Sequence, residues 1–248
     1  MEPYVSINDQ AKETQHSNAE LKQKISEANH ILVRQGVLDG FGHVSARSPL
    51  DHDRFLLSRN LAPALVTPDD IQELKLDATT EDSRPSYLER FIHAAIYRQR
   101  PDVQAVVHSH APAVVPYSTV GKPLRPILHM AGFLPDPTPV FEIRDVSGDE
   151  TDLLIRSNEQ ADHLASVLGI GSVALMRGHG SVAVGASVEE AVYNAIYTET
   201  NARGQALAEQ LGDPIYLTAG ERGTAEATMR SQLPRAWNFW LGQIVTKE

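Results

Sequence analysis

Apolar residues recur three and four positions apart in several segments of the chain, which is the spacing of an amphipathic helix. Two of these segments begin with capping-box spacing, at Ser17–Glu20 and at Ser187–Glu190. Pro101 stops another segment, and Gly169 ends a third. The pattern therefore predicts four helices, at about residues 17–36, 86–100, 157–169 and 188–211.

Other apolar runs are too short for helices and are typical of buried strands. The segments FGHVSAR at 41–47 and FLLS at 55–58 are interpreted as a strand pair. VQAVVHSHA at 103–111 predicts a further strand, and SVALMRGHGSVAVG at 172–185 predicts a strand, a tight turn and a second strand. This mixture of helices and strands indicates an α/β fold.

The remaining segments set the expected domain organisation. Residues 1–16 are polar and without pattern, so we expect a flexible N-terminal arm followed by a single domain over 17–248. Residues 76–85 predict an exposed loop, and the stretch from Pro112 to Pro139 is too rich in proline and glycine for long regular elements.

Composition narrows the chemistry that the chain can carry. Of its 248 residues 42% are hydrophobic and 22% are charged, as in soluble globular proteins. A net charge of −10 argues against nucleic acid and anionic membranes as partners. The sequence shows neither a membrane-spanning run nor a signal peptide, so we expect a cytoplasmic protein. With no cysteine, a metal site must use His, Asp or Glu.

His108 and His110 form the sharpest chemical feature. Side chains two positions apart on a strand leave the same face, so both imidazoles point into one space. Such a pair can present two nitrogens to one cation. The alternative is that the two histidines form hydrogen bonds in a polar pocket without a metal.

Two weaker candidates accompany that pair. Gly178 and Gly180 flank His179 and permit a tight turn in which a ligand can approach the imidazole closely, although a plain hairpin turn is the alternative. Glu89 can close a capping box with Ser86, pair with His93 one helical turn later, or act as a metal ligand and general acid/base. Spacing alone leaves these roles open.

The other histidines are sorted by context. His43 and His129 lie in turn-rich or proline-flanked segments suited to a pocket. We expect the side chains of His30 and His93 to lie at a helix surface or to pack against other residues. We expect three further histidine side chains to be exposed to solvent: His16, His52 and His163. A complete phosphate-binding loop and a nucleophile elbow are both missing from the sequence, which disfavours nucleotide binding and serine hydrolysis.

Four segments taken in order resemble the class II aldolase/adducin family: GVLDGFGHVSAR, RPSYLERFIHAAIY, RPDVQAVVHSHAP and LMRGHGSVAVG. The resemblance extends over about residues 20–217. It implies a three-layer α/β/α fold with a mostly antiparallel central sheet, and a homotetramer with active sites at subunit interfaces. It also implies one divalent cation per chain, held by His108, His110, His179 and Glu89, with Glu89 serving in addition as acid/base.

Departures from the family's sugar-phosphate aldolases point away from a phosphorylated substrate. His43 replaces an asparagine, Tyr87-Leu88 replaces a pair of serines, and Asn60-Leu61 replaces a phosphate-binding Thr/Ser-Gly. Leucine cannot donate a hydrogen bond to a phosphate, and burying a dianion without donors is very costly. The tyrosine that donates a proton in those aldolases falls at Met130, directly after His129.

The segments GHVSAR, SRN and RAWNFW are more similar to the family's decarboxylase branch, which includes a pyridine-dicarboxylate decarboxylase of vitamin B6 breakdown. That resemblance implies a retro-aldol-like decarboxylation of a hydroxylated aromatic or heteroaromatic (di)carboxylate, or of a related 2-oxo acid. Glu89 is the first candidate for the proton donor and His129 the second. The expected substrate-binding residues are His43, Ser58, Arg59, Tyr87 and Arg177.

Two other functions remain open at this point. The first is an aldolase acting on an unphosphorylated aldehyde or 2-oxo acid, which would share the metal and Glu89. The second is a catalytically silent, adducin-like scaffold, which the presence of all four candidate ligands disfavours. Three imidazoles and a carboxylate suit zinc or manganese and also tolerate cobalt or iron.

Overall fold

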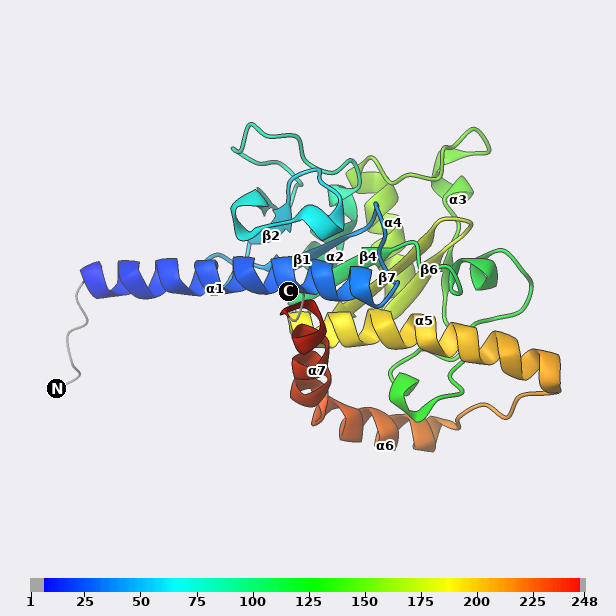
Figure 1. Cartoon of the computed structure of the whole chain (residues 1–248). Helices are drawn as coiled ribbons and strands as arrows, with labels where there is room; N and C mark the ends of the chain where they lie inside the picture. The colour runs from blue at the N-terminus through cyan, green and yellow to red at the C-terminus, as the bar shows by residue number, and fades with distance from the viewer. Residues whose placement is uncertain (1–6, 246–248) are drawn as a thin grey trace.

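The computed structural model describes residues 7–245 and contains a seven-stranded sheet with helices on both faces (Figure 1). The strand order is β3-β2-β1-β4-β7-β6-β5, and every neighbouring pair is antiparallel except β5 and β6. The strands are β1 (His43–Arg47), β2 (Arg54–Ser58), β3 (Ile71–Lys75), β4 (Ala105–Ser109), β5 (Val140–Phe141), β6 (Val173–Met176) and β7 (Gly180–Gly185).

Seven α-helices accompany the sheet in the described part of the chain. They are α1 (Ile7–Arg34), α2 (Arg90–Gln99), α3 (Arg144–Ser147), α4 (Asn158–Leu168), α5 (Val188–Leu211), α6 (Ala219–Arg230) and α7 (Leu233–Val245). Helices α1, α5 and α7 contribute to one apolar core, and α2 and α4 contribute to a second one.

Alternation along the strands explains why there are two cores. On β2, Leu56 packs into the core of α1 and α5, whereas its neighbours Phe55 and Leu57 pack into the core of α2 and α4. Val106 and Val107 on β4 divide between the two cores in the same way. The three-layer α/β/α fold with a mostly antiparallel sheet is thus confirmed.

Local signals fixed two of the helices correctly. Ser157 and Ser187 are the N-cap residues of α4 and α5, and their hydroxyls accept hydrogen bonds from the backbone N–H groups of Gln160 and Glu190. The strand pair β1–β2 and the hairpin β6–β7 also form as expected. The proline-rich stretch contains only short 3₁₀ turns, of which η3 (Val115–Ser118) and η4 (His129–Ala131) are used below.

Two expected helix starts are wrong. Helix α1 extends over Ile7–Arg34, so residues 7–16 are helical and the helix starts ten residues before Ser17. Residues 1–6 of the expected arm lie outside the described residues. Helix α2 begins at Arg90, and the Ser86 hydroxyl donates to the side chain of Gln72.

Among residues 7–245, no helix combines the length and apolar character needed to cross a bilayer.

Candidate metal centre

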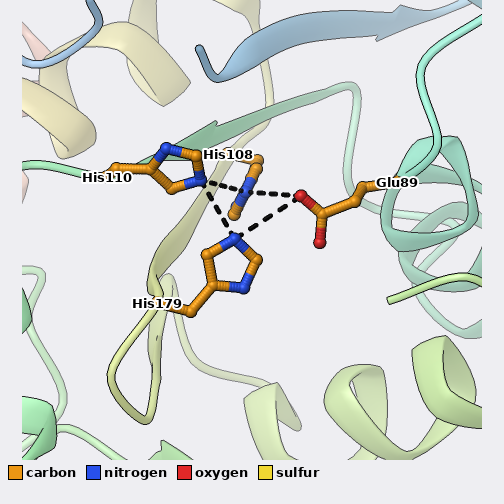
Figure 2. A group of neighbouring side chains, drawn as sticks. All are labelled: Glu89, His108, His110 and His179. Carbon is orange, nitrogen blue, oxygen red and sulfur yellow. Dashed lines mark hydrogen bonds and ion pairs between the residues drawn. The ribbon is translucent and has the colours of Figure 1, made fainter. Parts of the chain in front are cut away.

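Four side chains from distant parts of the sequence converge beside the sheet: Glu89, His108, His110 and His179 (Figure 2). Their ligand atoms all lie within 4.8 Å of one another. The Nε2 atom of His110 is 3.2 Å from that of His108 and 3.0 Å from that of His179. The Oε2 atom of Glu89 lies 3.5 Å from Nε2 of His108 and of His179.

Strands β4 and β7 bring the three histidines together. His108 is on β4, His110 follows the end of that strand, and His179 occupies the turn between β6 and β7. The next residue, Gly180, must be a glycine because a Cβ atom there would lie only 2.1 Å from the carbonyl oxygen of Ser109. This close backbone approach holds the turn carrying His179 against the end of β4.

The donor set fits a divalent cation. Four ligands in a tetrahedron at zinc–nitrogen distances of about 2.0–2.1 Å are roughly 3.3 Å apart. The four ligand pairs given above are 3.0–3.5 Å apart. Nδ1 of His108 lies 3.2 Å from the carbonyl oxygen of Ser181 and donates to it, which leaves the lone pair on Nε2 facing the cluster.

Glu89 is held as a buried carboxylate. Its Oε1 accepts a hydrogen bond from the backbone N–H of Ile155 at 3.0 Å. Burial raises the pKa of Glu89, but the neighbouring imidazoles of His108 and His179 outweigh that effect and hold the pKa below its ordinary value. Glu89 makes no capping hydrogen bond, and the nitrogens of His93 have other partners, so the capping and His93-pairing interpretations are wrong.

A buried chain of hydrogen bonds runs behind the cluster. Nδ1 of His43 lies 2.6 Å from Nε2 of His93, and Nδ1 of His93 lies 2.6 Å from Oγ of Ser45. The Ser45 oxygen is 2.8 Å from the hydroxyl of Tyr97. Burial lowers the pKa of His93 to about 3 and, with the charges of neighbouring histidines, also lowers that of His43.

Of the four residues in this hydrogen-bonded chain, the sequence analysis proposed only His43 as a site residue. His93 is fully buried, so the helix-surface alternative is wrong for it. His43 and Ser45 are two positions apart on a strand, and His93 and Tyr97 are four apart on a helix, so each pair shares a face. That spacing was the signal in the sequence that could have identified these residues. That the two faces meet could not be predicted, because it depends on the contact between β1 and α2.

A cavity of about 520 Å³ opens beside the cluster. Its residues come from the start of β1, the segment after β2, the approach to α2 and the segment before α4. They are Gly40, Phe41, Gly42, His43, Asn60, Leu61, Ala62, Tyr87, Leu88, Glu89, His110 and Leu154. No lysine or arginine occurs among these described lining residues.

Tyr87 forms part of the cavity wall and is firmly held. Its ring centre lies 4.5 Å from that of His43. Its hydroxyl donates to the carbonyl oxygen of Leu61 at 2.5 Å and lies 2.9 Å from the hydroxyl of Ser58. Ser58 is fully buried and contacts the tyrosine rather than the cavity. Burial raises the pKa of Tyr87, so its phenol remains protonated.

Three other candidate site residues are not brought into this cavity. The Arg59 guanidinium is paired with Asp70 at 2.7 Å, and the Arg177 guanidinium is paired with Glu142. His129 is exposed on η4, which packs against α5 and α6. None of these three residues lines the cavity beside Glu89 in the described chain.

The remaining histidines have no part in the cluster. His52 is exposed, as expected. His163 is partly buried and its ring packs edge-on against Phe141, so the expectation of a solvated side chain is wrong. His30 is partly buried on α1, and the side chain of His16 lies outside the described residues.

Comparison with known sequences gives a coherent set of relatives. The profile of the family described as "Class II Aldolase and Adducin N-terminal domain" matches residues 23–206. The decarboxylase tropJ of Talaromyces stipitatus is 42% identical over 243 residues, covering 88% of this chain and 91% of that protein. A 3,4-dihydroxyphthalate decarboxylase of Arthrobacter keyseri is 31% identical, covering 74% and 77% of the two chains.

Comparison with solved structures supports the fold. An L-fuculose 1-phosphate aldolase from Glaciozyma antarctica superposes with a TM-score of 0.77 at 22% identity, covering 98% of this chain and 93% of that one. An aldolase II superfamily protein from Pseudomonas syringae has a TM-score of 0.76 at 22% identity, with 92% and 93% covered.

Proposed function

The chain belongs to the class II aldolase and adducin family, and from that membership we propose that it is a divalent-metal-dependent decarboxylase. The substrate would be a hydroxylated aromatic or heteroaromatic carboxylate, or a related 2-oxo acid. The observation that carries the proposal is the cluster of three imidazoles and Glu89 at the wall of a cavity, in a chain whose relatives include named decarboxylases.

His108, His110, His179 and Glu89 would hold the cation, with zinc or manganese the first expectation and cobalt or iron the alternatives. When bound, the cation supplies Lewis-acid stabilisation of the negative charge that develops on a substrate oxygen. The protein's own contribution is to fix the four donor groups and to keep the Nε2 lone pair of His108 facing the site.

Glu89 can carry the proton through the reaction. As a carboxylate it accepts the proton of the substrate hydroxyl and passes it to the ring carbon that bears the departing carboxylate, which gives a keto tautomer. The bond between that carbon and the carboxylate then breaks and carbon dioxide leaves. The electron pair of the broken bond restores the aromatic ring, and the negative charge ends on the substrate oxygen. Its hydrogen bond from Ile155 fixes one oxygen while the other faces the histidines.

Tyr87 and His43 are the proposed contacts for the substrate ring. Both line the cavity next to Glu89, and the Tyr87 ring is held by Ser58 and Leu61. Leu61 and Leu88 make the rest of the wall apolar, which suits an aromatic substrate. Because Arg59 and Arg177 are engaged elsewhere, the cavity offers no cationic side chain for a second carboxylate among its described lining residues.

We further propose that residues 17–248 form one domain and that the chains assemble as a homotetramer with active sites at subunit interfaces. Val120, Leu207, Leu211 and Ile215 are large apolar side chains that a single chain leaves exposed. His129 would then act as a proton donor only in a neighbouring subunit's cavity. Light scattering coupled to size-exclusion chromatography tests the assembly, and a monomer would contradict it.

The direct test of the proposed function is release of carbon dioxide from a panel of hydroxylated aromatic carboxylates by the metal-loaded protein. Carbon dioxide without aldehyde supports a decarboxylase. Release of an aldehyde from an unphosphorylated substrate would favour the aldolase alternative, which uses the same cluster. Neither product from metal-loaded protein would contradict both.

A further inference from the structure

The proton positions in the buried chain from Tyr97 to His43 can be assigned from its contacts. All four members are almost completely buried, so their polar atoms depend on one another rather than on solvent. The chain contains one phenol, one hydroxyl and two imidazoles. Both imidazoles are buried and neither forms a hydrogen bond with a carboxylate in the described part of the chain, so each ring is neutral with one proton on one of its two nitrogens.

Tyr97 sets the direction of the chain. Burial raises the pKa of its phenol, which therefore keeps its proton and must donate it. Among the described residues, the hydrogen-bond contact of the Tyr97 hydroxyl is with Oγ of Ser45, so Tyr97 donates to Ser45.

The direction of this first hydrogen bond determines the positions of the protons on Ser45, His93 and His43. Because Ser45 accepts from Tyr97, its own hydroxyl proton is directed to Nδ1 of His93 at 2.6 Å. His93 consequently carries its proton on Nε2 and donates it to Nδ1 of His43, also at 2.6 Å. His43 accepts at Nδ1, so its own proton is on Nε2.

That nitrogen faces the cavity. No described residue forms a hydrogen bond with Nε2 of His43. This nitrogen is also not one of the fully buried polar atoms that lack a partner, so it is accessible from the cavity. His43 lines the cavity, and its ring centre lies 5.1 Å from that of the candidate ligand His108. The free N–H group is thus available to a molecule in the cavity, next to the candidate metal centre.

We propose that His43 is a fixed hydrogen-bond donor to a substrate oxygen through Nε2–H, and that His93, Ser45 and Tyr97 are positioning residues that impose this tautomer. The role toward substrate rests on the proposed decarboxylase function, whereas the tautomer does not. A neutral imidazole in this place stabilises negative charge on an oxygen without giving up its proton. The chain ends at buried Tyr97, so it orients His43 and does not conduct protons to solvent.

The tautomer is measured by proton–nitrogen correlation NMR on zinc-loaded protein labelled with ¹⁵N-histidine. We expect protonation of His43 and His93 at Nε2. Protonation of His43 at Nδ1 would overturn the proposal. In Tyr97→Phe, Ser45 is free to accept from Nδ1 of His93, so the Nδ1–H form of His43 should appear. An unchanged spectrum in that variant would overturn the role of Tyr97.

Tyr193→Phe is the matched control, because its buried hydroxyl donates to the backbone of Met130 outside the chain. Its histidine tautomers should equal those of the unmodified protein. For the substrate role, His43→Leu should lower kcat for carbon dioxide release roughly 10²–10³-fold with metal content preserved. Unchanged kcat would overturn that role. If even the unmodified protein releases no carbon dioxide, the proposed function fails while the NMR result still decides the tautomer.

Discussion

His43 and His108 face each other across neighbouring strands: their Cα atoms are register partners of β1 and β4, and their ring centres lie 5.1 Å apart. One residue is the proposed donor of the cavity and the other is a candidate metal ligand. Backbone hydrogen bonds of the sheet therefore fix the spacing of the two groups. Substrate and cation would be held by one rigid unit rather than by separate loops.

The metal assignment predicts that His110→Ala abolishes metal binding while the fold persists. His110 follows the end of β4 and is only partly buried, so its truncation leaves the sheet intact. Elemental analysis should find about one zinc or manganese per chain in the unmodified protein and none in the variant. His52→Ala, at an exposed position, is the control and should retain the metal. Equal metal content in the His110→Ala and His52→Ala variants would refute the assignment.

Replacing Glu89 by glutamine should remove its role in proton transfer while largely preserving the structure of the site. The amide oxygen can still accept the hydrogen bond from Ile155, but the side chain can no longer carry a proton or a negative charge. We expect carbon dioxide release to fall by about 10²–10⁴-fold, with part of the metal retained. Steady-state kinetics and elemental analysis on the same sample measure both. Near-normal turnover would exclude Glu89 as the acid/base.

The absence of lysine and arginine from the described cavity lining predicts a preference for substrates with a single carboxylate. Hydroxylated aromatic monoacids should react faster than the matching diacids. Leu88 is an exposed lining residue, and Leu88→Arg should raise the diacid-to-monoacid ratio of kcat/KM about five-fold, the effect of a half-exposed ion pair. Ile170→Arg, at an exposed position between α4 and β6, is the control and should not change the ratio. A diacid preference in the unmodified protein would contradict this view of the cavity.

Alanine substitutions at Gly180 and Gly223 should change the free energy of unfolding in opposite directions. In Gly180→Ala the new methyl would collide with the backbone of Ser109, and we expect a loss of about 1–3 kcal/mol in the free energy of unfolding. Gly223 lies inside α6 with open space around it, so Gly223→Ala should add about 0.5–1 kcal/mol. Denaturant unfolding measures both changes. A Gly180→Ala variant as stable as the parent would show that β4 and the His179 turn are not closely packed.

Buried His93 predicts an acid-sensitive fold. Its pKa is about 3 in the folded protein, mainly because of burial, against an ordinary value of about 6.5. The unfolded chain binds this proton more readily, so the stability contributed is complete above about pH 6.5 and falls by about 1.4 kcal/mol per pH unit between 6.5 and 3. In metal-stripped protein, His93→Gln should show a shallower loss between pH 7 and 5 than the parent. Partly buried His163 supplies the control variant, His163→Gln, and identical slopes in all three would contradict the prediction.

Some signals that act over short distances were read correctly from the sequence. Ser187 and Glu190 fixed the start of α5, and the two-residue spacing of His108 and His110 placed both rings in one space. These features depend only on neighbouring residues and on the period of the strand. The order of the family motifs added the expectation that His179 and Glu89 join them, and the geometry brings all four together.

Features that depend on distant contacts were missed or misjudged. The partner of Glu89 is the backbone of Ile155, 66 residues away, so its local spacing to Ser86 was misleading. His93 is buried because α2 packs where β1 presents His43 and Ser45, which no periodicity in either segment reveals. The two-residue strand β5 carries too short a pattern to be detected.

The candidate metal ligands and the cavity wall are supplied by different kinds of structure. The ligands sit on or beside β4, β7 and α2, whereas Gly40–Gly42, Asn60–Ala62 and Leu154 belong to connecting segments. Connecting segments tolerate exchange far better than paired strands do. Grafting these three segments between relatives is therefore a practical route to new substrate preferences. Gly42 would have to be kept, because a Cβ atom there would lie 2.8 Å from the carbonyl oxygen of His108.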